Sequence, residues 1–132
     1  MLSVINDYVL QQIYEKLKEN PRFKGFIYFS DHREDVEHNY GHEASKYTAT
    51  MSHIPLFMAF SPDFQAERAQ TVETLRSHEN SYWTNDLLYD VMTDILGIQG
   101  VPGTDLNWNL ASSQYSMTKD TLRTLHGKQA LQ

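Results

Sequence analysis

The chain has 132 residues, of which 40% are hydrophobic and 21% are charged, and its formal net charge is −6 with the histidines neutral. These values fit one globular domain with a buried core, and an acidic balance without a Lys/Arg cluster argues against a nucleic-acid partner. The sequence has no cysteine, which excludes disulfides and thiolate metal sites. Any metal would therefore be held by imidazole and carboxylate groups, which suit zinc, manganese or iron.

Helix and strand signals alternate in the first half of the chain. Residues 4–20 predict an amphipathic helix whose apolar stripe packs on a core. The stripe has a spacing of four between Ile5, Val9, Ile13 and Leu17, and Leu10 and Tyr14 widen it. Residues 25–29, GFIYF, predict a buried strand. Residues 53–60, HIPLFMAF, predict a second strand that starts at or after Pro55.

The second half contains helix signals and then an irregular tail. Ser61 and Pro62 predict a helix start, and the polar stretch from there to about residue 80 is interpreted as a surface helix or an ordered loop. Residues 84–96 predict an amphipathic helix that ends at Gly97. The predicted fold class is α/β, an incomplete doubly wound, mostly parallel sheet with flanking helices.

The stretch FIYFSDHREDVEHNYGH, residues 26–42, holds the strongest candidate site. Asp31 and His32 follow directly on the first strand, where the backbone can turn and bring both side chains to one point. A carboxylate and an imidazole are good zinc ligands, and a catalytic zinc normally has three protein ligands. The third ligand is left open among Glu34, His38, His42 or a residue elsewhere in the fold. The competing interpretation is a solvated loop rich in charged side chains.

The other polar and aromatic candidates receive a structural interpretation. His53 is expected to be a hydrogen-bonded boundary residue, and His78 and His126 to be surface residues. Asp90 and Asp94 are placed on the polar side of the helix at residues 84–96. Trp83 and Trp108 are expected to anchor local packing.

Four separated blocks resemble the alkaline-phosphatase superfamily, and within it the sulfatase-like phosphoethanolamine transferases that modify lipopolysaccharide. The run YFSDHRE with the later GHE is similar to the signature Y-x-S-D-H-G-E followed by G-H. IPLF with Ser61, the stretch from Tyr82 to Ile98 ending in DILGI, and the opening DYVLQQIYEKLK resemble further family segments in the same order. The resemblance covers about residues 5–98.

The resemblance implies roles for individual residues. In the family the Asp and His of the signature bind the active-site zinc, or manganese, which corresponds to Asp31 and His32. His42 is the best match for the histidine that contacts the transferred phosphate, with His38 as its rival. Glu34 matches an acidic residue that is expected to contact the metal ligands rather than the metal itself. Arg33 replaces the motif glycine, and its guanidinium offers a contact to phosphate.

The resemblance also implies that the chain is partial. The family's nucleophile, a further acidic zinc ligand and the membrane helices lie upstream of the matched segments, and no threonine here matches the nucleophile motif. Residues 1–98 are therefore expected to be the carboxyl-terminal part of a sulfatase-like catalytic domain, with residues 99–132 as an irregular tail packing on the same domain. Such a chain is expected to be inactive alone.

The implied setting is that of a lipopolysaccharide-modifying enzyme. The parent enzyme would use a phospholipid donor and a lipopolysaccharide acceptor. It would reside in the inner membrane, with this domain in the periplasm. This chain itself has neither a predicted signal peptide nor an apolar run of the roughly 20 residues that cross a bilayer.

Two alternatives remain. The first is a non-catalytic module that self-associates into a homo-oligomer through an unpaired sheet edge. The second is a complete small hydrolase in which His42 acts as a general base oriented by Asp31.

Overall fold

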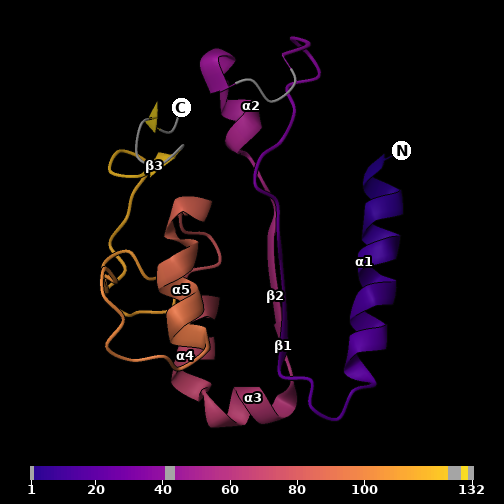
Figure 1. The fold of residues 1–132 in the computed structure, drawn as a ribbon, viewed down its shortest axis with the longest axis vertical. Helices are drawn as coiled ribbons and strands as arrows, with labels where there is room; N and C mark the ends of the chain where they lie inside the picture. Colours follow the sequence, from indigo (N-terminus) through magenta and orange to yellow (C-terminus); the bar gives the residue numbers. More distant parts are fainter. Residues whose placement is uncertain (1, 41–43, 125–128, 131–132) are drawn as a thin grey trace.

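The computed structural model describes residues 2–40, 44–124 and 129–130. Figure 1 shows β1 and β2 in the middle of the molecule, with α1 on one side and α4 and α5 on the other. This mixture of helices and strands confirms the prediction of a partial α/β fold. Within the described residues the elements are α1 (Leu2–Lys18), β1 (Gly25–Phe29), η1 (Ala44–Lys46), α2 (Ala49–Ser52), β2 (Leu56–Phe60), α3 (Pro62–Glu67), α4 (Ala69–Ser77), η2 (Asn85–Leu87), α5 (Leu88–Ile95), β3 (Arg123–Thr124) and β4 (Gln129–Ala130).

The strands β1 and β2 form an antiparallel pair. Gly25 lies opposite Phe60, and Phe29 lies opposite Leu56. The sequence predicts a mostly parallel sheet because both strands are continuously apolar, which is typical of sheets covered on both faces. Here an antiparallel pair has the same pattern, since helices lie on both of its sides. The parallel character of a larger sheet stays a prediction.

The two faces of the strand pair contact different helices. Ile27 lies opposite Met58, and both pack against the main core. On the other face, the rings of Phe26 and Tyr14 of α1 have centroids 6.1 Å apart. The alternation of side chains along a strand therefore divides the apolar residues of β1 and β2 between the two helix layers.

The main core lies between the strands and the helices α3 to α5. Ser61 caps α3 as predicted, because its Oγ accepts a hydrogen bond from the Phe64 backbone N–H at 3.1 Å. Val72 of α4 is buried, so this helix contributes to the core rather than lying on the surface as a loop. The buried members of the core are Phe64, Val72, Val91, Ile95, Leu110 and Ala111.

The helix α1 packs differently from its prediction. The stripe that was expected in the core is exposed at Val9 (45%), Ile13 (44%) and Leu17 (40%). Leu10 and Tyr14, the residues that widen the predicted stripe, are half-buried and face the strands. Within the described residues α1 lies beside β1 and β2, and α4 and α5 lie on the opposite side of these strands (Figure 1). The two strands therefore cover a narrower face of α1 than its apolar residues offer.

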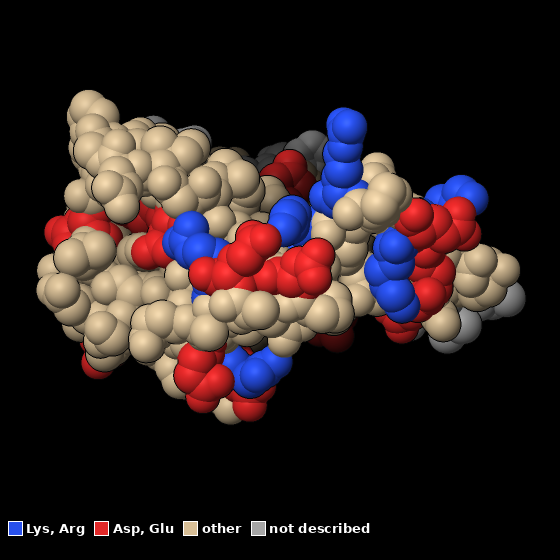
Figure 2. All heavy atoms as spheres, turned by 90° about the horizontal axis from the view of Figure 1, so that it is seen from below, with Lys and Arg blue, Asp and Glu red and all other residues tan. Residues whose placement is uncertain are grey.

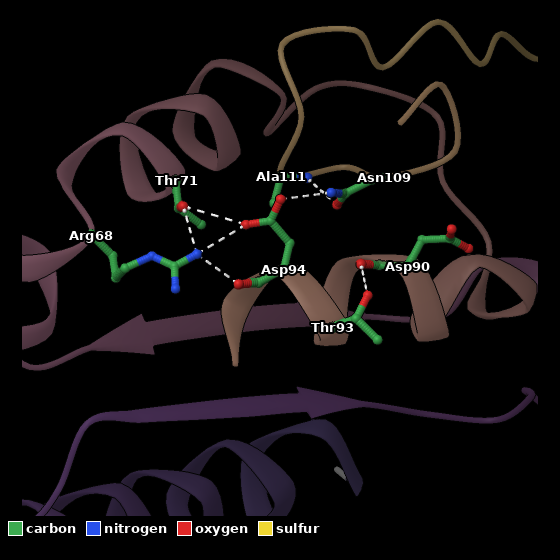
Figure 3. Close-up of polar contacts among 7 residues, drawn as sticks. All are labelled: Arg68, Thr71, Asp90, Thr93, Asp94, Asn109 and Ala111. Atoms are coloured by element: carbon green, nitrogen blue, oxygen red, sulfur yellow. Dashed lines mark hydrogen bonds and ion pairs between the residues drawn. The ribbon is translucent and has the colours of Figure 1, made fainter. Parts of the chain in front are cut away.

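A polar network attaches the tail to α5, as Figure 3 shows. Arg68 Nη2 donates to the backbone oxygen of Asp94 at 2.6 Å and to its Oδ1 at 3.1 Å. Asn109 Nδ2 donates to Asp94 Oδ2 at 2.8 Å. Asp90 is buried and accepts from the Asp105 backbone N–H at 2.8 Å. The polar side of α5, on which the sequence places Asp90 and Asp94, is thus covered by the tail.

Two further expectations about aromatic and histidine side chains need correction. His78 is half-buried, and its Nδ1 bonds to the backbone oxygen of Leu110 at 2.8 Å. Trp83 packs against the core as expected, whereas Trp108 is 44% exposed. The position His126 lies outside the described residues.

Charged side chains of both signs are neighbours on the surface. Figure 2 shows Lys and Arg beside Asp and Glu on the face seen from below. The described ion pairs include Lys24 with Glu67 at 2.8 Å and Lys18 with Glu15 at 3.0 Å. Such exposed pairs contribute little to stability.

Candidate metal centre

The backbone after β1 is held in a turn by local and long-range hydrogen bonds. Ser30 Oγ donates to the backbone oxygen of His32 at 2.6 Å. The Arg33 backbone N–H donates to the Met51 oxygen at 2.9 Å, which ties the turn to α2. Asn85 Nδ2 donates to the Asp31 oxygen at 2.8 Å and ties it to η2. The turn therefore has fixed connections to two other elements.

This turn brings the side chains of Asp31 and His32 together. His32 Nε2 lies 3.6 Å from Asp31 Oδ2. The other carboxylate oxygen, Asp31 Oδ1, accepts from the His32 backbone N–H at 3.0 Å. The two side chains are 84% and 44% exposed for Asp31 and His32, respectively. One oxygen of the carboxylate is thus fixed by the backbone, and the other faces the imidazole.

The separation fits two ligands of one tetrahedral zinc ion. Ligand distances of roughly 2.1 Å and tetrahedral angles place two donor atoms about 3.4 Å apart, close to the observed 3.6 Å. No group of three His, Asp or Glu side chains with metal-binding geometry occurs among the described residues. His42 lies outside them. Among the described residues the predicted metal site thus has two candidate donors, Asp31 and His32, and their role as ligands stays a prediction.

A cavity of about 160 Å³ lies beside the pair. Arg33 lines it together with Asp31 and His32. Hydroxyl groups are present too, since Tyr47 Oη and Ser52 Oγ are 2.8 Å apart and both residues line the cavity. Both hydroxyl hydrogens are engaged, because Ser52 Oγ donates to the Ala49 oxygen at 3.0 Å and Tyr47 Oη donates to Ser52. The arginine beside metal-type ligands is the feature suited to an anionic group such as a phosphate ester.

Arg33 takes the place of the motif glycine without backbone strain. The described non-glycine residue with a positive φ is Asn39, at 55°. Arg33 is not in that region, so the position does not require the conformational freedom of glycine. The replacement therefore leaves the backbone of the turn unstrained.

A buried carboxylate that the sequence did not single out organises the rest of the loop. Asp35 is 1% exposed. It accepts from Thr48 Oγ1, from the His38 backbone N–H at 3.1 Å and from His38 Nδ1 at 2.9 Å. The Thr48 hydroxyl and the bonds from His38 hold the pKa of the Asp35 carboxyl below its usual value. The spacing of three between Asp35 and His38 was the available signal.

Two other predicted site residues, His38 and Glu34, lie outside the lining of the cavity beside Asp31. His38 is 59% exposed at its side chain and is bound to Asp35, and it does not line the cavity beside Asp31. Glu34 is exposed. The supporting role predicted for Glu34 and the phosphate contact considered for His38 stay predictions.

Comparisons with known proteins identify the family. A family model described as Sulfatase matches residues 3–95, which is more than two thirds of the chain. Curated proteins and solved structures gave no match. Among the described helices, none is both long and apolar enough to cross a membrane. Sulfatase-family proteins usually bind a metal, and the matched range includes the turn that carries Asp31 and His32. The chain belongs to the sulfatase family.

Proposed function

We propose that this chain carries the carboxyl-terminal part of the catalytic domain of a metal-dependent phosphoethanolamine transferase acting on lipopolysaccharide. The single observation that carries the proposal is the 3.6 Å approach of His32 Nε2 to Asp31 Oδ2 beside an Arg-lined cavity. The resemblance of the four sequence blocks supports the choice of this branch over other sulfatase-like hydrolases. The donor would be a phospholipid and the acceptor a lipopolysaccharide sugar or phosphate.

Each residue of the turn has a defined task in this proposal. Asp31 and His32 hold zinc, or manganese, through one carboxylate oxygen and one imidazole nitrogen. When bound, the metal supplies Lewis-acid stabilisation of charge on phosphoryl oxygens. Arg33 binds a phosphoryl oxygen through its guanidinium, which matches phosphate geometry better than an ammonium does. His42 contacts the same phosphoryl group.

The chain alone is proposed to turn over little substrate. The family's reaction starts from a threonine or serine nucleophile, and none of the threonines here matches that motif. Other polypeptide, from a longer chain or a second one, would supply it together with the remaining metal ligand. The parent enzyme is proposed to reside in the inner membrane with this domain in the periplasm.

Metal binding tests the proposal directly. We expect the metal-free chain to bind zinc by calorimetry, and Asp31→Ala and His32→Ala each to weaken that binding at least tenfold, because each removes a ligand. His53→Ala and Asp120→Ala, which replace exposed residues, should bind like the unmodified chain. Equal zinc affinity in all variants would contradict the assignment. Zinc-dependent phosphodiester hydrolysis lost in Asp31→Ala would contradict only the expected inactivity.

A non-catalytic, self-associating module is the second candidate. The exposed apolar stripe at Val9, Ile13 and Leu17 favours it, since contiguous apolar surface commonly marks an interaction site. A chain that binds no zinc yet forms a defined oligomer would support this candidate over the first.

A further inference from the structure

The outer edge of β2 lies along a large groove. In the described sheet β2 pairs only with β1, so its second edge has no strand partner there. A groove of about 1080 Å³ is lined by every residue of β2 and by no residue of β1. Tyr14 of α1 lines one wall, and Val72 and Leu75 of α4 line the other. The groove therefore continues the plane of the strands between the two helix layers.

The register of β1 and β2 fixes which backbone groups face this groove. The Ser61 N–H donates to the Lys24 oxygen at 2.9 Å, which makes Lys24 and Ser61 a hydrogen-bonded pair. In an antiparallel pair such positions alternate, so Ala59 and Phe57 also direct their N–H and C=O groups to β1. The backbone groups of Leu56, Met58 and Phe60 consequently point outward. These outward groups are symmetric about Met58.

Two further features indicate that a strand belongs at this edge. Trp83 Nε1 is buried and has no hydrogen-bond partner within the described residues. Trp83 lines the groove. The β2 sequence LFMAF contains no charge and no proline, which are the usual means of preventing edge pairing. A strand in the groove would bring backbone carbonyl acceptors to the side where Trp83 lies.

We infer that β2 pairs with β2 of a second copy of this chain, antiparallel and centred on Met58, to form a four-stranded sheet across two chains. In this register Met58 lies opposite the copy's Met58, and Leu56 lies opposite the copy's Phe60, so every outward N–H and C=O group of residues 56–60 meets a partner. The Phe60 oxygen, which already accepts from Gln65 Nε2 at 2.9 Å, would accept its second hydrogen bond from the copy's Leu56 N–H.

Side-chain size also favours a second copy. Phe57 is 50% exposed and would lie opposite the copy's Ala59, on the same face of the sheet. Within one chain, Phe57 lies opposite Tyr28 and Ala59 lies opposite Phe26. All four side chains therefore lie on the same face of the sheet. In the joined sheet, Phe57 of each chain lies opposite Ala59 of the other, so a large side chain pairs with a small one at both positions. The pairing does not depend on the proposed metal chemistry.

Sedimentation and cross-linking of the full chain test the pairing. We expect a sedimenting mass of twice 15.4 kDa. Because the chain has no cysteine, a mixture of Phe57→Cys and Ala59→Cys chains should form a disulfide-linked dimer on mild oxidation. Chains with Phe57→Cys alone should not, since diagonal neighbours lie about 7–8 Å apart, beyond disulfide reach. A monomeric mass, or a dimer without the mixed cross-link, would overturn the inference.

A charged substitution at the edge provides a second test. Phe57→Lys places two ammonium groups on one face of the joined sheet and should convert the dimer to a monomer. Tyr89→Lys is the matched control, because Tyr89 is 51% exposed and lies on α5; it should keep the dimer. Retention of the dimer by Phe57→Lys would count against the β2 interface.

Discussion

At the scale of single residues, a short sequence signature predicted the pair formed by Asp31 and His32. It did not predict Asp35, the buried carboxylate that accepts hydrogen bonds from the loop that follows. Asp31 and His32 are adjacent, so local backbone geometry alone brings them together. Asp35 depends on Thr48, thirteen positions later, and only the folded loop makes that contact. A buried carboxylate with several hydrogen-bond donors should make stability depend on pH.

The Asp35 carboxyl gives a specific pH prediction. Its folded pKa is depressed below the ordinary value of 3.8, so ionised Asp35 stabilises the fold above that pH, and this contribution is lost as the pH falls through the folded value. We expect the Tm difference between the unmodified chain and Asp35→Asn to shrink in acid. Asp120→Asn, at an exposed position, should track the unmodified chain. Parallel Tm curves for the unmodified chain and Asp35→Asn would contradict the prediction.

At the scale of elements, helix ends and strand starts were predictable where one residue type determines the backbone. β2 starts at Leu56, directly after Pro55, because proline cannot donate to the ladder. Gly97 follows α5 with φ at 70°, as expected for a helix-terminating glycine. The burial of Asp90 was not predictable, because it depends on the Asp105 backbone of the irregular tail. Helix periodicity does not reveal contacts with irregular segments.

Gly97 gives a prediction at this scale. An alanine Cβ at Gly97 would lie 2.8 Å from Arg68 Nη1, and a left-handed backbone costs a non-glycine residue about 1–2 kcal/mol. Gly97→Ala should therefore lower the free energy of unfolding in urea by more than this backbone cost. Gly100→Ala is the matched control, since Gly100 has φ at 68° and nothing within 4 Å of its added Cβ. Equal losses would show that the Arg68 contact has no energetic effect.

At the scale of the whole molecule, the sequence predicted an α/β arrangement but misplaced part of the core. Periodicity indicates that a helix has an apolar face, and it does not indicate how much of that face a neighbour covers. The residues Leu10 and Tyr14 meet the strands, while the adjacent stripe with Ile13 is exposed. The core lies instead on the α4 and α5 side of the sheet, where residues of the tail complete it.

Two isoleucines distinguish the covered side of the molecule from the uncovered one. Ile95 is 6% exposed in the core and Ile13 is 44% exposed on α1. Removing buried aliphatic carbons leaves a cavity, so Ile95→Ala should lower the free energy of unfolding by about 2–5 kcal/mol. Ile13→Ala should cost well under half as much, because solvent already reaches the side chain. Urea unfolding of both variants at the same protein concentration measures the difference. Similar losses would mean that another surface covers the α1 stripe in solution, since an exposed side chain has no cavity to leave.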